Sequence, residues 1–341
     1  KLGSMDGHGR PLRFPKVDMQ TGEVGESVEV ADTVEGGLTP VLSVKNLVTR
    51  FAIRSGLFGR VTGAVHAVEN ISFDLFQGET LSLVGESGCG KSTTGRSITR
   101  LVEPESGEVS LDGYDVLKLG PTDLRSLRRS VQMIFQDPFS SLNPRMTVGS
   151  AVAEPMIKHR IASPSDARRK AADLLERVGL SSTMMDRYPH EFSGGQRQRV
   201  AIARALALNP KVIVADESVS ALDVSIKAQV CNLLMDLQEQ FKIAFLFISH
   251  DMAVVERVSH RVAVMYLGEI VEIGPRTQIF ANPQHAYTKK LMAAVPVPDP
   301  ARRGIRRNAG IEELKSPVRN VGYVAPKREY REVSPGHLVL A

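Results

Sequence analysis

The sequence predicts an α/β protein whose core is a parallel β-sheet, because apolar strand-length runs alternate with helical patterns. Three runs, at 80–84, 211–216 and 243–248, are almost continuously apolar, as expected of strands covered on both faces. A mostly helical stretch from about 138 to 208 interrupts the alternation. At 341 residues the chain is too long for one compact core, so we expect a large domain with appended parts.

The amino-terminal part is expected to contain a linker followed by strands. Residues 1–40 are rich in Gly, Pro and acids and lack periodicity, which is typical of a linker or leader. Strand patterns follow at 41–51 and 66–75, and a turn at Gln77-Gly78 leads into the strand at 80–84. Further on, a helical pattern at 124–130 precedes a strand at 131–135.

The carboxyl-terminal half continues the alternation of helices and strands. Within the helical stretch, the pattern at 166–180 is expected to end at Gly179 as a C-cap. An amphipathic helix at 226–240 separates two buried strands, and 261–274 has the pattern of a β-hairpin. A last helix at 285–296 is expected to stop at Pro296.

Composition limits the cellular setting. Only Cys89 and Cys231 are present, so no disulfide framework exists and a reducing compartment is expected. The densest apolar run, 243–248, is far shorter than a membrane span, so a membrane function would require other subunits to cross it. Residues 301–341 hold nine Lys or Arg and four Glu, which accounts for the net charge of +5 and predicts a basic, solvated tail.

A glycine-rich turn after the strand at 80–84 fits the phosphate-binding pattern G-x-x-x-x-G-K-[ST]. Its glycines allow backbone N–H groups to surround phosphate oxygens, Lys91 can reach the β- and γ-phosphates, and the Ser92 hydroxyl is a ligand for Mg²⁺. A chance glycine turn is disfavoured because an apolar strand precedes it and a helix follows. The nucleotide-binding candidates are Gly85, Glu86, Ser87, Gly88, Cys89, Gly90, Lys91, Ser92 and Thr93.

Polar residues at other strand ends complete a hydrolytic site. Asp216 can join the Mg²⁺ shell, Glu217 can orient and polarise the attacking water, and Gln136 supplies an amide for water or Mg²⁺. His250, at the end of another strand, can donate to the γ-phosphate. Each residue alone could be an ordinary polar strand end, but four strand ends at one edge of an α/β sheet favour a ligand site.

A second glycine-rich turn, Ser193-Gly194-Gly195-Gln196, opens a helical pattern far from the first. Backbone N–H groups and the dipole at a helix start bind anions, yet the phosphates of this chain's own nucleotide are already held by the first turn. A glycine helix cap is the structural alternative, but such glycines belong at helix ends rather than starts.

These motifs together resemble those of ABC-transporter ATPases, in the family's order and over about residues 41–295. The matching segments are the Walker A motif at 85–93, the Q-loop Gln136, the signature at 193–196, the Walker B pair 216–217, the D-loop "SALD" ending at Asp223 and the H-loop His250. The resemblance implies a P-loop (RecA-like) parallel sheet core, an antiparallel β subdomain, a helical signature subdomain at about 138–208 and a carboxyl-terminal extension.

The resemblance also implies how the second turn works. In the family, two ATPase domains pair head to tail, and Ser193 with the following amides would contact the γ-phosphate held by the partner domain. Phe51 lies where the family has an aromatic residue that stacks on adenine; a core Phe is the alternative. The expected cofactors are ATP and Mg²⁺. We expect an ATPase domain at 41–275 and a basic, partly flexible extension at 276–341.

Longer sequence segments, such as "YPHEFSGGQRQRVAIARAL" and "NPQHAYTKKLMAAVP", resemble those of the ATPases of bacterial dipeptide, oligopeptide and glutathione importers. The implied partners are two integral-membrane permease subunits and, indirectly, a periplasmic substrate-binding protein, with the ATPase at the cytoplasmic face of the inner membrane. Many such ATPases bind an iron–sulfur cluster near their carboxyl terminus; no cysteine follows Cys231, so we expect none here. A soluble ABC ATPase acting on ribosomes or nucleic acid is the alternative; for an importer we expect no nucleic-acid partner.

The amino-terminal segment "KLGSMDGHGRPLRFP" resembles the linker that follows the first ATPase half in tandem importers of the glutathione type. It favours a second half of a two-ATPase polypeptide. A cloning remnant before a single-ATPase subunit is the alternative, because the segment contains Gly-Ser-Met.

Overall fold

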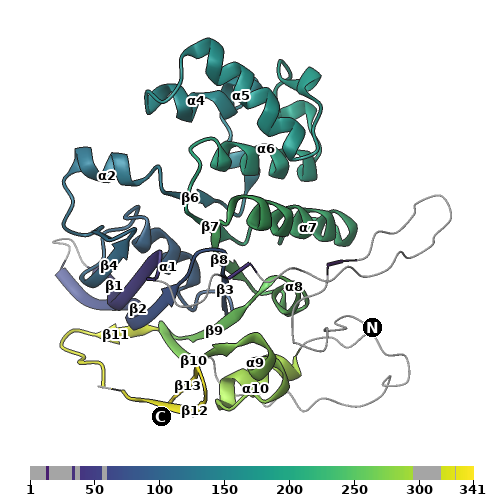
Figure 1. Cartoon of the computed structure of the whole chain (residues 1–341). Helices are drawn as coiled ribbons and strands as arrows, with labels where there is room; N and C mark the ends of the chain where they lie inside the picture. Colours follow the sequence, from purple (N-terminus) through teal and green to yellow (C-terminus); the bar gives the residue numbers. More distant parts are fainter. Residues whose placement is uncertain (1–12, 15–32, 35–38, 56–59, 295–315, 327) are drawn as a thin grey trace.

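The computed structural model describes residues 13–14, 33–34, 39–55, 60–294, 316–326 and 328–341. Figure 1 shows a helical part above two sheets, with the carboxyl-terminal extension below them. Most of the linker expected at 1–40, and the stop expected at Pro296, lie outside the described residues.

The larger sheet has eight strands in the order β12-β13-β10-β9-β3-β8-β7-β6. Neighbouring strands from β9 to β6 are parallel, as the apolar runs predict, and the remaining three strands are added antiparallel. The strands are β3 Thr80–Val84, β6 Val131–Ile134, β7 Val212–Asp216, β8 Ala244–Ser249, β9 Arg261–Tyr266, β10 Glu269–Pro275, β12 Tyr330–Ser334 and β13 His337–Leu340.

Both faces of this sheet are buried, which explains the continuous apolar runs. On β7 and β8, Ile213 and Phe245 pack into a core shared with the helical part. The next residues, Val214 and Leu246, point to the opposite face and pack into a second core shared with the smaller sheet.

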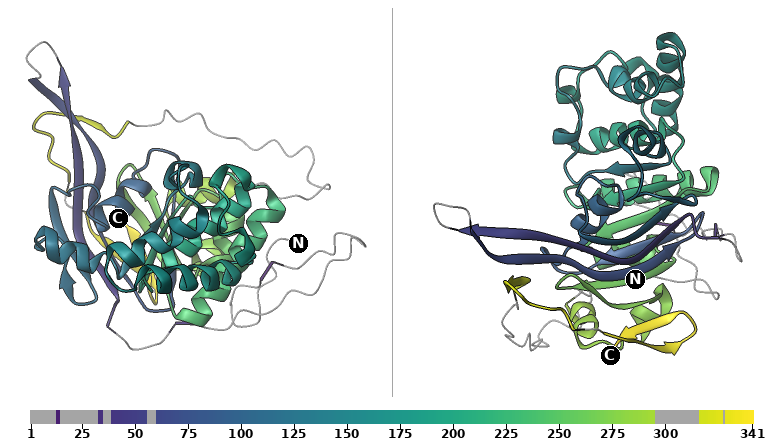
Figure 2. Two further views of the ribbon diagram at one scale, coloured as in Figure 1. Left: turned by 90° about the horizontal axis from the view of Figure 1, so that it is seen from above. Right: turned by 90° about the vertical axis from the view of Figure 1, so that its left-hand side faces the viewer.

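The smaller sheet is antiparallel and has the strand order β11-β2-β1-β4-β5. Its two long strands β1 and β2 form a hairpin that projects from the body in Figure 2. The strands are β1 Leu42–Ser55, β2 Arg60–Leu75, β4 Ser106–Leu111, β5 Tyr114–Asp115 and β11 Val318–Asn320.

The helical part contains the helices expected between 138 and 208. Ser163 caps the third of them by accepting from the Asp166 N–H, Pro164 occupies its first position, and Gly179 follows its end with a φ of 76°. The elements are α3 Pro138–Ser141, α4 Val148–Lys158, α5 Pro164–Arg177, the 3₁₀ turns η1 Ser182–Met184 and η2 Pro189–Glu191, and α6 Gly194–Leu206.

Four further helices, outside the helical part and the carboxyl-terminal extension, flank the two sheets. The long α7 separates β7 from β8, as the amphipathic pattern predicts. The helices are α1 Lys91–Ile98, α2 Pro121–Leu127, α7 Val224–Phe241 and α8 Met252–Val258.

The carboxyl-terminal extension joins both sheets, which the sequence did not predict. Besides α9 Arg276–Ala281 and α10 Ala286–Ala293, it supplies β11 to the smaller sheet and β12 with β13 to the larger one. These strands are short, and their partners lie far away in sequence, so local periodicity carries little signal for them.

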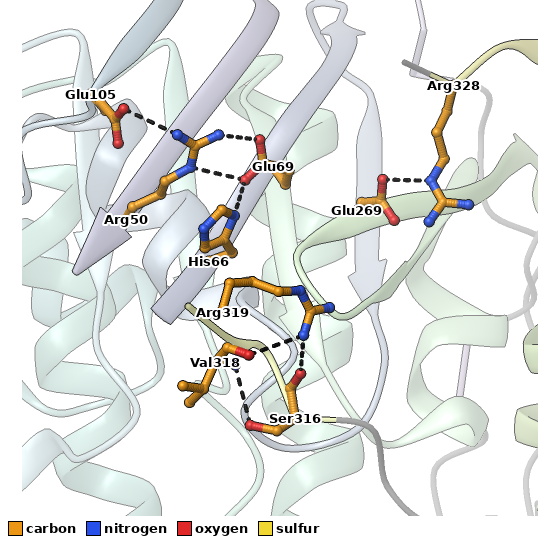
Figure 3. A network of polar contacts seen from close by, with 9 residues as sticks. All are labelled: Arg50, His66, Glu69, Glu105, Glu269, Ser316, Val318, Arg319 and Arg328. Atoms are coloured by element: carbon orange, nitrogen blue, oxygen red, sulfur yellow. Dashed lines mark hydrogen bonds and ion pairs between the residues drawn. The ribbon is translucent and has the colours of Figure 1, made fainter. Parts of the chain in front are cut away.

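Polar contacts fasten the extension to the rest of the structure (Figure 3). Arg328 forms an ion pair with Glu269 on β10 at 2.9 Å. A second group of contacts shown there lies within the smaller sheet: Arg50 on β1 donates two hydrogen bonds to Glu69 on β2, at 2.6 and 3.0 Å, and His66 on β2 contacts the same carboxylate at 2.7 Å.

Two short pieces of the amino-terminal segment pack on the body. Phe14 lies beneath the Arg257 guanidinium at 4.6 Å, and its backbone exchanges hydrogen bonds of 3.0 and 2.9 Å with the Asn232 side chain. Thr33 is buried and donates its hydroxyl to the Gly78 carbonyl at 2.6 Å. Phe14 and Thr33, both within the expected linker, are therefore fixed to the body that the two sheets and their helices form.

Candidate functional site

The phosphate-binding turn lies between β3 and α1, as the sequence predicts. Gly90 has a φ of 109°, and a Cβ there would lie 1.9 Å from the Ala67 carbonyl oxygen. Gly85 is similarly confined, because a Cβ would lie 2.2 Å from the Met265 carbonyl oxygen. By contrast, Gly88 is exposed, has a φ of 81° and faces open space. Close backbone approach therefore requires glycine at two of the three positions.

Lys91 is buried, and its ammonium donates to the Gly85 and Glu86 carbonyl oxygens of the same turn, each at 2.8 Å. Its charge is therefore held at the centre of the turn, where it can meet phosphate oxygens. Within the turn Cys89 is also buried, and burial raises the pKa of its thiol. Cys89 is therefore a protonated packing residue at neutral pH.

Two of the three residues expected to bind Mg²⁺, Ser92 and Asp216, lie side by side, whereas the third, Gln136, contacts Glu217. The Ser92 hydroxyl donates to the Asp216 carboxylate at 2.6 Å, joining the start of α1 to the end of β7. Asp216 is buried, and burial raises the pKa of its carboxyl. One hydroxyl and one carboxylate oxygen fit Mg²⁺, which takes hard oxygen ligands and few protein groups.

Two side chains at the sheet edge, Gln136 and His250, converge on the carboxylate of Glu217. The Gln136 amide donates to its carboxylate at 2.8 Å, and His250 Nδ1 lies 3.4 Å from the other carboxylate oxygen. Glu217 has a left-handed backbone with a φ of 45°, uncommon for a residue other than glycine. Its N–H donates to the Ile248 carbonyl at 2.9 Å, which helps to hold this conformation. The structure thus brings together the residues expected at four strand ends.

The second glycine-rich turn begins α6, and its residues have different surroundings. Ser193 and Gln196 form a capping box: the Ser193 hydroxyl accepts from the Gln196 N–H at 3.3 Å, and the Gln196 side chain accepts from the Ser193 N–H at 2.9 Å. Gly195 is buried against Ile226 of α7, whereas Gly194 is exposed. Sequence reasoning missed the capping box, although the Ser-x-x-Gln spacing could have shown it.

The N–H groups of Gly194 and Gly195 have no acceptor within the described part of the chain. Within the same described part of the chain, no hydrogen bond joins residues 193–196 to the phosphate-binding turn. The remaining site residues lie at the surface: Asp223 is exposed before α7, and Phe51 on β1 is 43% exposed, which excludes it from the core.

Comparison with known proteins defines the class. A model of the ABC transporter family matches residues 68–220, and a model of the oligopeptide/dipeptide transporter C-terminal region matches residues 271–319. The ATP-binding cassette MJ0796, solved as a dimer in a post-hydrolysis state with ADP and Pi, is 30% identical. It aligns over 69% of this chain and 98% of that chain with a TM-score of 0.62. The chain therefore belongs to the ABC-transporter family of ATP-binding cassettes, which are ATPases.

Curated proteins similar to this chain belong to a narrower group within that family, the glutathione import ATP-binding proteins. The glutathione import ATP-binding protein GsiA of Pectobacterium atrosepticum is 57% identical over 338 residues, 99% of this chain and 54% of the relative. GsiA of Escherichia coli strain K12 is also 57% identical, over 340 residues. The chain spans about half the length of the curated relatives it matches. Among solved structures, cbiO1 from Clostridium perfringens, part of a transporter complex, is 26% identical over 72% of this chain and 92% of its own, with a TM-score of 0.62.

Proposed function

We propose that this chain binds and hydrolyses ATP with Mg²⁺ to power import of glutathione or peptides through separate permease subunits. The observation that best supports this proposal is that Ser92, Asp216 and Glu217 lie together beside the phosphate-binding turn. The proposed ATPase domain comprises residues 41–275, and the extension comprises residues 276–341.

Each side chain has a proposed role in hydrolysis. Lys91 and the turn amides bind the phosphates, while Ser92 and Asp216 would hold Mg²⁺, which neutralises charge that develops on the phosphate oxygens. Glu217 accepts a hydrogen bond from the Gln136 amide and can orient and polarise the attacking water. His250 is exposed beside Glu217, so its ring can reach toward the γ-phosphate.

The start of α6 is proposed to bind the γ-phosphate held by a second ABC ATPase domain. The unpaired N–H groups of Gly194 and Gly195 support this proposal, because a helix start with free donors binds anions. Asp223 is proposed to lie at the same interface. Phe51, exposed on β1, is proposed to stack on adenine.

The permease contact is proposed at a groove between the helical part and the larger sheet. Its lining includes Phe135 and Leu101, whose exposed fractions of 37% and 51% are large for apolar side chains. Phe135 directly precedes Gln136, so an occupant that displaces it can change the contact of Gln136 with Glu217. Among the described residues, no helix is long and apolar enough to cross a membrane.

Glutathione import is the favoured transport function because the GsiA relatives carry that name and align along nearly the whole chain. The location proposed is the cytoplasmic face of the bacterial inner membrane, with a periplasmic binding protein that supplies substrate. Co-purification tests this against an action on ribosomes or nucleic acid: we expect permeases, and recovery of ribosomes or RNA instead would refute import. Transport by the intact complex should then be compared for glutathione and dipeptides.

A mixing experiment tests the head-to-tail pairing. Ser193→Arg should leave ATP binding by the isolated chain nearly unchanged and abolish ATP-driven pairing, whereas Lys91→Ala should weaken binding itself. A mixture of the two variants retains one composite site with both halves intact, so some association or hydrolysis should return. If Ser193→Arg alone abolishes ATP binding by the monomer, the second turn acts within its own chain.

A further inference from the structure

The extension makes a direct contact with the phosphate-binding turn. The N–H of Glu86, the second residue of that turn, donates to the hydroxyl oxygen of Tyr287 on α10 at 2.9 Å. The two residues are 201 positions apart, so only docking of the extension brings them together. Tyr287 was not among the site residues that the sequence indicated.

The Tyr287 ring is held firmly in place. It is buried, and its centroid lies 4.3 Å from that of Tyr266 at an interplanar angle of 31°. Burial raises the pKa of its hydroxyl, which therefore stays protonated at neutral pH. The ring belongs to the same apolar cluster as Val84, the last residue of β3 before the turn, so the cluster supports the turn as well.

A buried carboxylate fixes the start of α10. Glu272 on β10 is completely buried and accepts from the backbone N–H groups of Gln284 at 2.8 Å and His285 at 2.9 Å. His337 on β13, itself buried, contacts the same carboxylate at 2.7 Å. Tyr287 follows His285 by two positions, so these contacts with Glu272 anchor the backbone that carries its ring.

The turn is thus held from two sides at one residue. Lys91 binds the Glu86 carbonyl from inside the turn, while Tyr287 binds the Glu86 N–H from the extension. Together these contacts hold the backbone N–H and the backbone carbonyl of Glu86. They therefore fix the orientation of the backbone that leads into the phosphate-binding turn.

We propose that Tyr287 is a positioning residue through which the carboxyl-terminal extension holds the phosphate-binding turn ready for ATP. Its hydroxyl contacts the turn, and the turn contacts the phosphates. The inference rests on the proposed role of residues 85–93 in ATP binding. Because the contact orders the turn before ATP arrives, it strengthens binding of ground state and transition state alike.

Tyr287→Phe in the full chain removes the hydroxyl and keeps the ring. We expect the dissociation constant for ATP, measured by calorimetry, to rise about three- to tenfold, the equivalent of one ordinary hydrogen bond. The KM for ATP should rise in parallel, while kcat at saturating ATP stays unchanged. Exchange of the Glu86 amide proton should accelerate in the variant, because its acceptor is lost.

Tyr330→Phe is the matched control. Its hydroxyl also makes one hydrogen bond from the extension, at 2.6 Å, but it donates to the Ile270 carbonyl of β10 and not to a residue of the turn. Both variants should lose similar thermal stability without nucleotide, and only Tyr287→Phe should lose ATP affinity. Equal ATP affinity in Tyr287→Phe and wild type would overturn the inference, and so would an equal loss in both variants.

Lys91→Ala separates failure of this inference from failure of the proposed function. If Lys91→Ala retains wild-type ATP affinity, residues 85–93 do not hold the nucleotide, and the proposed function fails. If Lys91→Ala loses affinity while Tyr287→Phe does not, the proposed function stands and the positioning role of Tyr287 is refuted.

Discussion

A stabilising substitution that stops ATP-driven pairing is the sharpest test of the second glycine-rich turn. Gly194 is the first residue of α6, is exposed, and would meet nothing within 4 Å if it carried a Cβ. Its φ lies outside the left-handed region, so alanine fits the backbone without strain. Nothing in the part of the chain that the structure describes therefore requires glycine at this position.

The expected magnitudes follow from that geometry. Alanine in a helix is favoured over glycine by up to about 1 kcal/mol, so Gly194→Ala should unfold at the same or a higher temperature than wild type. ATP affinity of the isolated chain should not change, because the phosphate-binding turn is untouched. If a partner's phosphate approaches the free N–H groups, the added methyl obstructs it, and losing a hydrogen bond to a charged group costs about 1.5–3 kcal/mol. Pairing should then weaken about tenfold to a hundredfold.

Sedimentation velocity with ATP measures the pairing. Glu217→Gln is the suitable background, because impaired hydrolysis should prolong the ATP-bound pair. Gly195→Ala is the contrasting variant: its Cβ would lie 2.5 Å from Ile226 Cγ2, so it should lower the stability of the isolated chain. Wild-type pairing and hydrolysis in Gly194→Ala would show that no phosphate approaches the start of α6.

Further predictions concern the turn, the chemistry and the smaller sheet. Gly90→Ala should abolish ATP binding in calorimetry because its Cβ meets the Ala67 carbonyl, whereas Gly88→Ala, which meets only open space, should bind more weakly but measurably; equal binding by both would contradict the steric reasoning. In a phosphate-release assay, Glu217→Gln should lower kcat at least about a hundredfold while ATP still binds, and normal turnover would exclude Glu217 as the water-orienting group. Burial opposes ionisation of Glu69, but hydrogen bonds from Arg50 and His66 outweigh it and leave its pKa lowered. This stabilisation is present above the unfolded pKa of about 4.5 and is lost as pH falls through the lower folded value. Glu69→Gln should therefore lower the free energy of unfolding by about 2 kcal/mol at pH 7 in urea titrations, with a shrinking difference below pH 4.5; a pH-independent difference would rule out the charge as its cause.

Local signals predicted the parts of the molecule that local physics determines. The apolar runs 211–216 and 243–248 form interior strands, which are apolar throughout because both faces of the larger sheet are covered. The glycine-rich turn at 85–93 was predictable because close backbone approach demands glycine at fixed spacing. The role of Ser193 was only partly predicted, since its capping of α6 is local but was overlooked.

Non-local pairing explains what the sequence did not reveal. β11 pairs with β2, and β13 pairs with β10, across long stretches of chain, so nothing near Val318 or His337 indicates a partner. The contact of Tyr287 with Glu86 depends on that docking and was equally invisible. An isolated Tyr in a helical pattern is normally a packing residue, and this one is that as well.

The hydrogen bonds of the two glycine-rich turns indicate that the first turn serves the chain's own nucleotide and the second serves a nucleotide on a partner domain. In the first turn, Ser92 is paired with Asp216, Lys91 with the turn carbonyls, and the Glu86 N–H with Tyr287, so the chain itself supplies the order that a nucleotide needs. In the second turn, Ser193 and Gln196 satisfy each other, whereas the N–H groups between them have no acceptor in the described chain. A helix start whose cap is complete but whose next donors are free is stable alone and still able to bind an anion. Such a site stays folded without a ligand and keeps its N–H groups available for the phosphate of ATP bound to another domain, which is what ATP-dependent pairing requires.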